Sequence, residues 1–146
     1  MNVFSAMEIA SSGLNAQRVR MNTIASNLAN ARTTQTAQGG PYQRLDPVFR
    51  AVPLSEKKSL SGSDEKSANA THLVEVAEIR SDPNPPQRVY DPNHPDADKE
   101  GFVNLPNVNV VEEMVNMITA SRAYEAGVTL TQSLKGMARS ALSIGA

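Results

Sequence analysis

Proline divides this chain into three parts. All nine prolines of the 146 residues lie between Pro41 and Pro106, so both ends of the chain are free of proline. Because proline inside a helix costs about 3 kcal/mol, long helices can form at the two ends but not in the middle. The sequence therefore predicts an N-terminal helix in residues 1–34, a small β-rich middle domain in residues 35–106, and a C-terminal helix in residues 107–146.

Apolar residues recur at heptad spacing in the N-terminal segment, as they do in helices that pack along one another. The positions of this seam are held by Met7, Leu14, Met21 and Leu28, with Ile24 at the complementary offset. Ser5 followed three residues later by Glu8 has the form of a capping box. The pattern predicts a helix from about Ser5 to Asn30 with one face against a partner.

The C-terminal segment carries the same kind of pattern. Asn109 can cap a helix, and Glu112 and Glu113 place negative charge where the helix dipole favours it. The predicted seam consists of Val110, Met114, Met117, Ser121, Tyr124, Val128, Thr131, Leu134, Met137, Ala141 and Ile144. A repeated step of three residues after Thr131 predicts a local disturbance of the seam.

The apolar surface of these helices is wider than one partner helix can cover. On the first helix Phe4, Ile9, Val19 and Ala25 lie off the seam. Exposed apolar area of this kind marks an interaction surface. The residues alone leave two readings open, a small monomeric bundle of two amphipathic helices or a helix pair that packs against further chains.

The middle of the chain predicts short strands and turns. Residues 71–80 are rich in β-branched residues, and further strands are expected at 47–52, 87–90 and 101–105. Together they predict a small antiparallel β element. Residues 55–70 are polar and serine-rich, which predicts a mobile loop.

Composition excludes several functional classes. The net charge of −1 includes no basic block, so nucleic acid is not an expected partner. There is no cysteine, which rules out disulfides and cysteine-ligated zinc. The N-terminus has neither the basic region nor the apolar stretch of a cleavable signal peptide, and no window reaches the roughly 20 apolar residues of a membrane span. We therefore expect no insertion into a membrane.

Residues 96–107 offer the one candidate for metal chemistry. Asp96, Asp98 and Glu100 fall at ligand positions of a calcium loop, but Asn107 stands where the loop needs its bidentate glutamate. A calcium-dependent module or small hydrolase here is the weakest reading. The sequence predicts neither an enzyme nor a cofactor.

The two ends resemble a known family. Residues 12–34 closely resemble the N-terminal signature of the bacterial flagellar rod, hook and hook-associated axial proteins. The match is carried by Ser12-Gly13-Leu14, Ala16, Asn22, Ile24-Ala25, Asn27-Leu28-Ala29-Asn30 and Thr33. Residues 106–126 resemble the matching C-terminal helix. Five shorter segments are most similar to the subunits of the proximal rod: 17–21, 41–44, 89–92, 101–103 and 106–110.

This resemblance implies a fold and a function. The fold is α+β, with the terminal helices paired as an antiparallel coiled coil and the β-rich middle outside it. The function is that of a structural subunit of the basal-body rod in the periplasmic space, assembling helically with copies of itself and other rod proteins and transmitting torque. Export through the flagellar type III apparatus without a cleavable signal is implied as well.

The residues expected to carry assembly are those of the two seams and three asparagines. The packing residues are Met7, Leu14, Met21, Ile24, Leu28, Met114, Met117, Tyr124, Val128, Leu134 and Met137. Asn22, Asn27 and Asn30 are the polar candidates for fixing register, with local capping as the alternative for each. The competing function is a cytosolic coiled-coil adaptor or export chaperone, which would form a stable low oligomer with ordered terminal helices.

Overall fold

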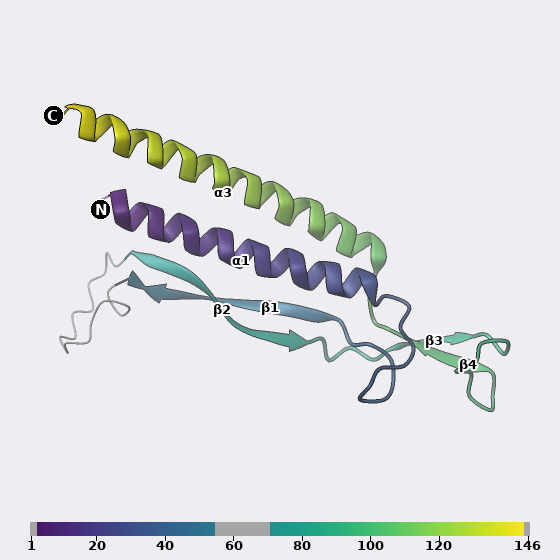
Figure 1. The fold of residues 1–146 in the computed structure, drawn as a ribbon. Coiled ribbons are helices and arrows are strands. Elements are labelled where there is room, and N and C mark those ends of the chain that lie inside the picture. Colours follow the sequence, from purple (N-terminus) through teal and green to yellow (C-terminus); the bar gives the residue numbers. More distant parts are fainter. Residues whose placement is uncertain (1–2, 55–70, 145–146) are drawn as a thin grey trace, which may run out of the picture.

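The computed structural model describes residues 3–54 and 71–144 and shows two long helices lying over two antiparallel strand pairs (Figure 1). In chain order the elements are α1 (Val3–Ala29), β1 (Leu45–Pro53), β2 (His72–Ser81), β3 (Gln87–Tyr90), β4 (Phe102–Leu105) and α3 (Val110–Ile144). The helices run in opposite directions, and both ends of the chain lie at the same end of the helix pair. The predicted α+β class is confirmed.

The helix boundaries agree with the sequence at one helix and differ slightly at the other. Asn109 caps α3, because its Oδ1 accepts hydrogen bonds from the backbone N–H of Val111 at 3.1 Å and of Glu112 at 3.4 Å. By contrast α1 begins at Val3, two residues before the predicted cap at Ser5. Nothing before Ser5 breaks a helix, so the helix continues back through Phe4 to Val3.

The four predicted strands are present, but they form two separate sheets instead of one β element. β1 pairs with β2 from Leu45↔Ser81 to Pro53↔His72, with a bulge where Val48 and Phe49 face the partner strand. β3 pairs with β4 without a register shift. The predicted loop at 55–70 lies outside the described residues.

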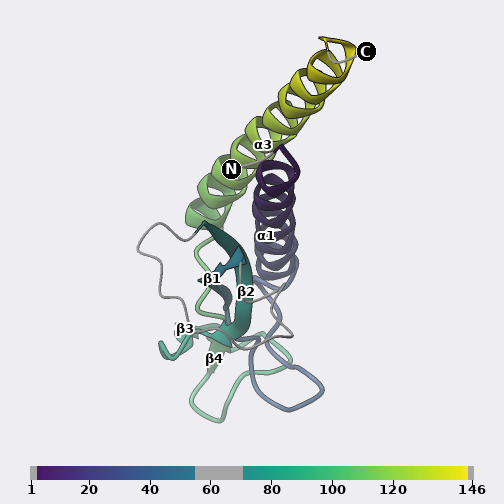
Figure 2. The same ribbon diagram turned by 90° about the vertical axis from the view of Figure 1, so that its left-hand side faces the viewer.

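Helix α1 is the central layer of the molecule. It lies between α3 on one side and the β1–β2 pair on the other (Figures 1 and 2). Leu73 of β2 is buried, and the Ser12 hydroxyl of α1 accepts a hydrogen bond from the Val74 N–H at 3.2 Å. The β1–β2 pair is therefore fastened along the helix that α3 also covers. The β3–β4 pair lies beyond the end of α1, near the start of α3.

The covered face of α3 differs in detail from the predicted seam. The buried and half-buried positions that continue along the helix in unbroken steps of three and four are Met117, Ala120, Tyr124, Gly127, Thr131, Leu134 and Ala138. The disturbance predicted at Thr131 is therefore absent. Gly127 and Ala138 lie on this face next to the predicted Val128 and Met137, and Met137 is exposed. At Gly127 the missing side chain makes room for Leu14 of α1.

The apolar core is small. Among the residues that the structure describes, its buried members are Ala16, Ile24, Leu73, Val103, Val108 and Ala120. Two of these six are alanines, whose burial contributes little transfer free energy. Specific contacts between the elements must therefore supply much of what fixes this arrangement.

Candidate assembly site

A buried asparagine joins α1 to the first strand and to α3. Asn27 Nδ2 donates to the Leu45 carbonyl at 2.9 Å and to Glu113 Oε2 at 3.0 Å. Its Oδ1 accepts from the Leu45 N–H and from the Tyr42 hydroxyl, each at 2.9 Å. Both hydrogens and both lone pairs of the amide are thus used, which is the full capacity of an asparagine side chain. A side chain satisfied in this way fixes the relative position of three segments.

Glu113 is a fully buried carboxylate with a charged partner. Its Oε1 accepts from Arg44 Nε at 2.7 Å, while Oε2 accepts from Asn27. Arg44 also pairs with Asp46 and lies 3.7 Å from Asp82. We call Asn27, Tyr42, Arg44 and Glu113 the junction cluster.

The charge of Arg44 is secured by these partners. Burial of the guanidinium acts to lower its pKa, but the hydrogen bonds and charges of Glu113 and Asp46 outweigh this effect and raise the pKa. Arg44 is therefore a permanent cation at the junction. A buried pair of this kind is most costly when only one partner is removed.

The backbone around Arg44 is fixed as well. Its N–H donates to Asn107 Oδ1 at 2.9 Å, and its carbonyl accepts from the Asp82 N–H at 2.7 Å. Asn107 in turn donates to the Asn84 carbonyl at 3.2 Å. The segment that precedes α3 is thus tied to the start of β1 and to the segment that follows β2.

The predicted assembly residues differ in exposure: some are buried, most are half-buried and three are exposed. Ile24 and Asn27 are buried. The half-buried residues are Met7, Leu14, Met21, Leu28, Asn30, Met117, Tyr124, Val128 and Leu134. Asn22, Met114 and Met137 are exposed.

The other two predicted asparagines, Asn22 and Asn30, differ in role from Asn27. Asn30 makes local contacts at the end of α1, donating to the Ser26 carbonyl at 2.9 Å and accepting from the Thr33 hydroxyl at 3.2 Å. Asn22 is exposed on the helix surface. Only Asn27 reaches from one helix of the described structure to the other.

Leu14 of α1 packs closely against Gly127 of α3. A Cβ atom added to Gly127 would lie 2.9 Å from Leu14 Cδ2 and 3.3 Å from its Cγ. Glycine is therefore the residue that lets α3 come this near to α1. Leu14 and Tyr124 also meet at the edge of a groove beside this contact.

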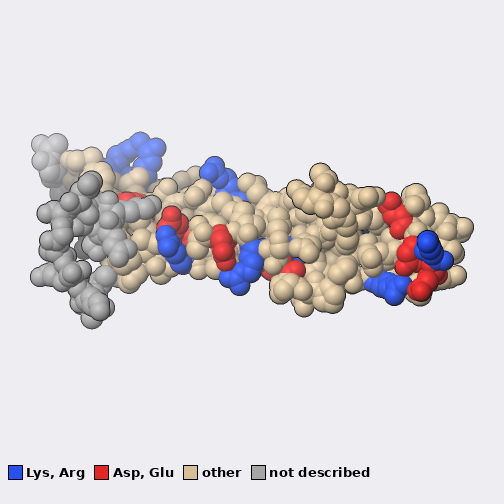
Figure 3. Space-filling view, turned by 90° about the horizontal axis from the view of Figure 1, so that it is seen from below, with Lys and Arg blue, Asp and Glu red and all other residues tan. Residues whose placement is uncertain are grey.

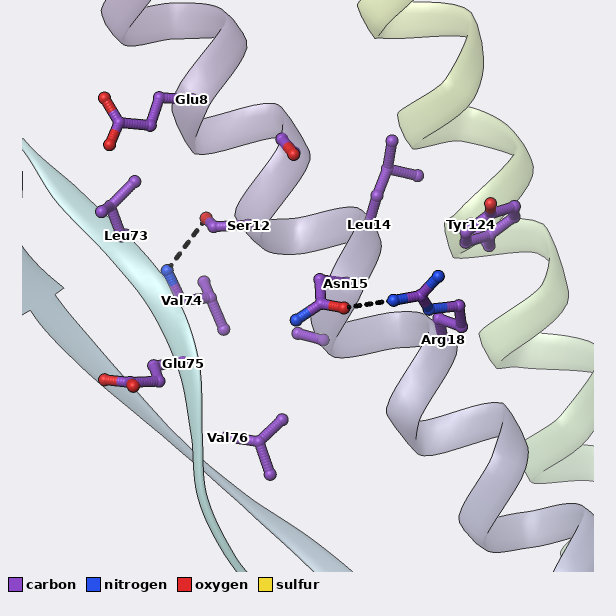
Figure 4. Close-up of a pocket in the computed structure, with 12 residues that line it drawn as sticks. Glu8, Ser12, Leu14, Asn15, Arg18, Leu73, Val74, Glu75, Val76 and Tyr124 are labelled. Atoms are coloured by element: carbon purple, nitrogen blue, oxygen red, sulfur yellow. Dashed lines mark hydrogen bonds between the residues drawn. The ribbon is translucent and has the colours of Figure 1, made fainter.

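That groove lies between α1 and β2 (Figure 4). Its volume is about 550 Å³, and Glu8, Arg18 and Glu75 contribute its charges. Several polar groups on its wall are engaged within the chain: Arg18 donates to Asn15 Oδ1 at 2.9 Å, Ser12 donates to the Ile9 carbonyl at 2.7 Å, and Glu75 pairs with Arg50. These groups connect parts of the protein, whereas the polar groups of a ligand pocket converge on a guest.

The outer face of α3 is apolar where the helix starts. Val111, Met114, Val115 and Ile118 are exposed over 71%, 54%, 58% and 54% of their surface. We call these four residues the α3-start patch. The four residues are spaced by three or four positions, so they share one face of the helix, opposite the buried Glu113. An exposed apolar patch of this kind marks an interaction surface.

The candidate calcium loop is a connection between β3 and β4. Asp98 Oδ1 accepts from the backbone N–H of Phe102 and of Glu100, each at 2.9 Å. Arg88 donates to Asp98 and to Glu100 at 3.0 Å, and lies 4.3 Å above the centre of the Phe102 ring. The carboxylates of Asp98 and Glu100 therefore accept hydrogen bonds that hold β3, β4 and their connection together. Within residues 3–54 and 71–144, no group of three or more metal-ligating side chains could hold a metal ion.

Positive and negative side chains are interspersed on the face that carries the strand pairs (Figure 3). None of the helices in the described part of the chain is long and apolar enough to cross a membrane. The surface feature that stands out is therefore the apolar side of α3, together with the junction cluster that holds α3 in place.

Sequence reasoning identified Asn27 but missed the charged members of the junction cluster. The sequence indicates for Glu113 only a favourable charge at the start of a helix, and Arg44 lies within a segment that carries the family resemblance. No spacing rule connects two residues 69 positions apart. The available signal is that Glu113 falls four residues before Met117 and seven before Ala120, on the face of the helix that is covered.

Comparison with known proteins identifies the family. A model described as "Flagella basal body rod protein" matches residues 7–35, and one described as "Flagellar basal body rod FlgEFG protein C-terminal" matches residues 99–144. Proteins named flagellar basal-body rod protein FlgC are similar over the whole chain. The one from Borreliella burgdorferi is 46% identical over 99% of this chain and 98% of its own. Those from Bacillus subtilis and Salmonella typhimurium are 40% and 37% identical, each over 99% of both chains. The chain belongs to the FlgC family of flagellar basal-body rod proteins.

Proposed function

We propose that this chain is a structural subunit of the flagellar basal-body rod that assembles through its terminal helices and transmits torque, without catalysis or a cofactor. The observation that carries the proposal is the α3-start patch, since four large apolar side chains on one helix face require a cover. The relatives named for the rod support the place of assembly.

The geometry suits a load-bearing element. The junction cluster connects both helices and the first strand through charged and fully satisfied hydrogen bonds. The partners we propose are copies of this chain, other rod proteins and the flagellar type III export apparatus. The proposed location is the rod in the periplasmic space, reached without a cleavable signal.

The test is complementation in a motile bacterium whose own FlgC gene is deleted. The intact chain should restore swimming and should be recovered in isolated basal bodies. Val115→Asp places a charge in the α3-start patch and should abolish both. Arg80→Asp, a charge change on an exposed β2 position, is the matched control and should leave both intact. A chain that restores neither swimming nor incorporation would refute the proposed function.

A further inference from the structure

Methionine is the side chain of this protein that peroxides oxidise most readily. The chain contains six methionines and neither cysteine nor tryptophan. Oxidation of methionine to the sulfoxide turns a flexible apolar side chain into a polar one, and a shielded sulfur reacts more slowly than an exposed one. The exposure of each methionine therefore decides where an oxygen atom is added first.

The five methionines that the structure describes differ in exposure. Met114 and Met137 are 54% and 57% exposed, whereas Met7, Met21 and Met117 are half-buried. The two exposed methionines both lie on α3, about 35 Å apart along the helix axis. We expect oxidation of the free chain to begin at these two sulfurs.

Met114 belongs to the α3-start patch and has only apolar neighbours along the helix surface. The residues three or four positions away from it are Val110, Val111, Met117 and Ile118. None of these side chains carries a hydrogen-bond donor. Among its helix neighbours a sulfoxide oxygen at Met114 finds no partner, so water has to supply the hydrogen bond.

Met137 has different surroundings. Ser133, four residues before it, and Ser140, three residues after it, are both exposed and both carry a hydroxyl group. A sulfoxide at this position stays beside polar groups. Met137 is therefore an equally exposed sulfur that lies outside the α3-start patch, and it provides the internal comparison.

We propose that Met114 is an oxidation site whose sulfoxide blocks the α3-start patch. The patch is open to oxidants in the free subunit, before a partner covers it. A peroxide transfers one oxygen atom to the Met114 sulfur; the thioether gives up two electrons, and hydrogen peroxide is reduced to water. Reduction of the sulfoxide by a thiol-dependent reductase restores the thioether.

The block follows from the lack of donors in the patch. When a partner covers the patch, the water that serves the sulfoxide oxygen is displaced, and the oxygen is left buried without a hydrogen bond. The thioether has no such requirement. This inference rests on the proposed function, because it takes the α3-start patch to be a surface that assembles.

Peptide mapping by mass spectrometry tests the chemistry on the purified full chain. During treatment with dilute hydrogen peroxide, Met114 and Met137 should gain an oxygen atom several-fold faster than Met117, which lies one helical turn beyond Met114. Equal rates at Met114 and Met117 would overturn the assignment of the site. This measurement does not depend on the proposed function.

Two substitutions separate polarity from shape at this position. Met114→Leu keeps the patch apolar and cannot be oxidised, whereas Met114→Gln places a polar group there permanently. In the complemented bacterium, Met114→Leu should be recovered in basal bodies as well as the intact chain, and Met114→Gln at about one-tenth of that level. Equal recovery of the two variants would overturn the proposal, while absence of the intact chain from basal bodies would refute the proposed function.

A competition experiment tests oxidation itself without a polar substitution. Cells that produce the intact chain and Met114→Leu together expose both to the same pulse of hydrogen peroxide and to the same partners. Once mapping of the free intact chain shows the sulfoxide at Met114, the share of Met114→Leu in new basal bodies should rise. In a parallel competition against Met137→Leu, the share should stay constant. A constant share in the first competition, or a rise in the second, would overturn the proposal.

Discussion

The Nδ2 atom of Asn27 on α1 lies 3.0 Å from Oε2 of Glu113 on α3, and both side chains are buried. The same two side chains also hold Leu45 and Arg44 at the start of β1. A one-residue slip of either helix would break these bonds and leave polar groups buried without partners. The pair therefore fixes the register of the helices against each other and against the strand.

Replacing Asn27 by alanine should lower the free energy of unfolding by more than an exposed asparagine would. Asn27→Ala leaves Glu113 and both backbone groups of Leu45 short of a partner, so we expect a loss of about 2–3 kcal/mol in the free energy of unfolding. Urea denaturation of the full chain, followed by circular dichroism, measures it. Asn22→Ala, exposed on the same helix, should change stability by no more than about 0.5 kcal/mol. Equal effects at the two positions would contradict the role of Asn27.

The two partners of the buried ion pair should respond unequally. Arg44→Leu leaves the Glu113 carboxylate buried without a cation and should cost about 3–5 kcal/mol. Glu113→Leu should cost less, because Arg44 keeps Asp46 and Asp82 beside it. The double replacement should be more stable than Arg44→Leu alone.

The control for this cycle is the exposed pair of Arg50 and Glu75, whose atoms are 3.0 Å apart. Arg50→Leu should cost at most about 1 kcal/mol, as exposed ion pairs do. If Arg44→Leu proved as mild as Arg50→Leu, the buried pair would have no special part in stability.

Two glycines of α3 should respond to alanine in opposite ways. Gly136 has open space where a Cβ would stand, so Gly136→Ala should stabilise the helix by about 0.5–1 kcal/mol. Gly127→Ala gains the same helix propensity but drives a Cβ to 2.9 Å from Leu14 Cδ2. The free energy of unfolding of the Gly127→Ala variant should therefore be lower than that of the Gly136→Ala variant by at least about 1 kcal/mol. The measurement is the thermal unfolding temperature of each variant relative to the original chain. Equal stabilisation by both substitutions would show that Leu14 and α3 can move apart at this contact without cost.

The β3–β4 pair should weaken in acid through Asp98. The backbone N–H of Phe102, with that of Glu100 and the Arg88 guanidinium, lowers the pKa of Asp98 below its usual value of 3.8. Since the folded pKa is the lower one, the carboxylate stabilises the pair at pH above the usual value, and this is lost as pH falls through the folded pKa. The amide resonance of Phe102 should report this titration by NMR. In Asp98→Asn the resonance should stay constant over the same range; a titration unchanged by this substitution would assign it to another group.

Hydrogen exchange should reveal a gradient along the helix pair in the isolated chain. Amides of α3 near Glu113 should exchange slowly, because the junction cluster fastens them, and those of residues 139–144 should exchange fastest, because no helix covers them. Uniform protection along α3 would contradict this gradient. In assembled basal bodies the fast region should become protected.

The sequence was sufficient to predict the elements because local rules determine them. Proline placement and heptad spacing predicted both helices, the Asn109 cap predicted the start of α3, and β-branched segments predicted all four strands. These signals act over a few residues and need no knowledge of distant contacts. Asn27 was found because a polar residue beside a seam has few roles other than register or capping.

The arrangement of the elements could not be derived in the same way. Burial of Glu113 depends on Arg44, which reaches it only after the chain has turned back, and the charge of Glu113 alone argues for exposure. The covered face of α3 includes Gly127 because Leu14 of α1 packs into the space that a larger side chain would fill. The strands form two separate sheets, and β2 is hydrogen-bonded to α1 through Val74 and Ser12; strand propensity expresses neither arrangement.

The position of the junction cluster has a mechanical consequence. Asn27, Arg44 and Glu113 lie at one end of the helix pair, and both termini lie at the other. The helix pair therefore resembles a cantilever held most firmly at its root, with packing such as that of Leu14 against Gly127 holding the helices together farther out. A sideways force on the tips acts with the longest moment arm about the root, so contacts made by neighbouring subunits near the tips would add most to the stiffness of an assembled rod.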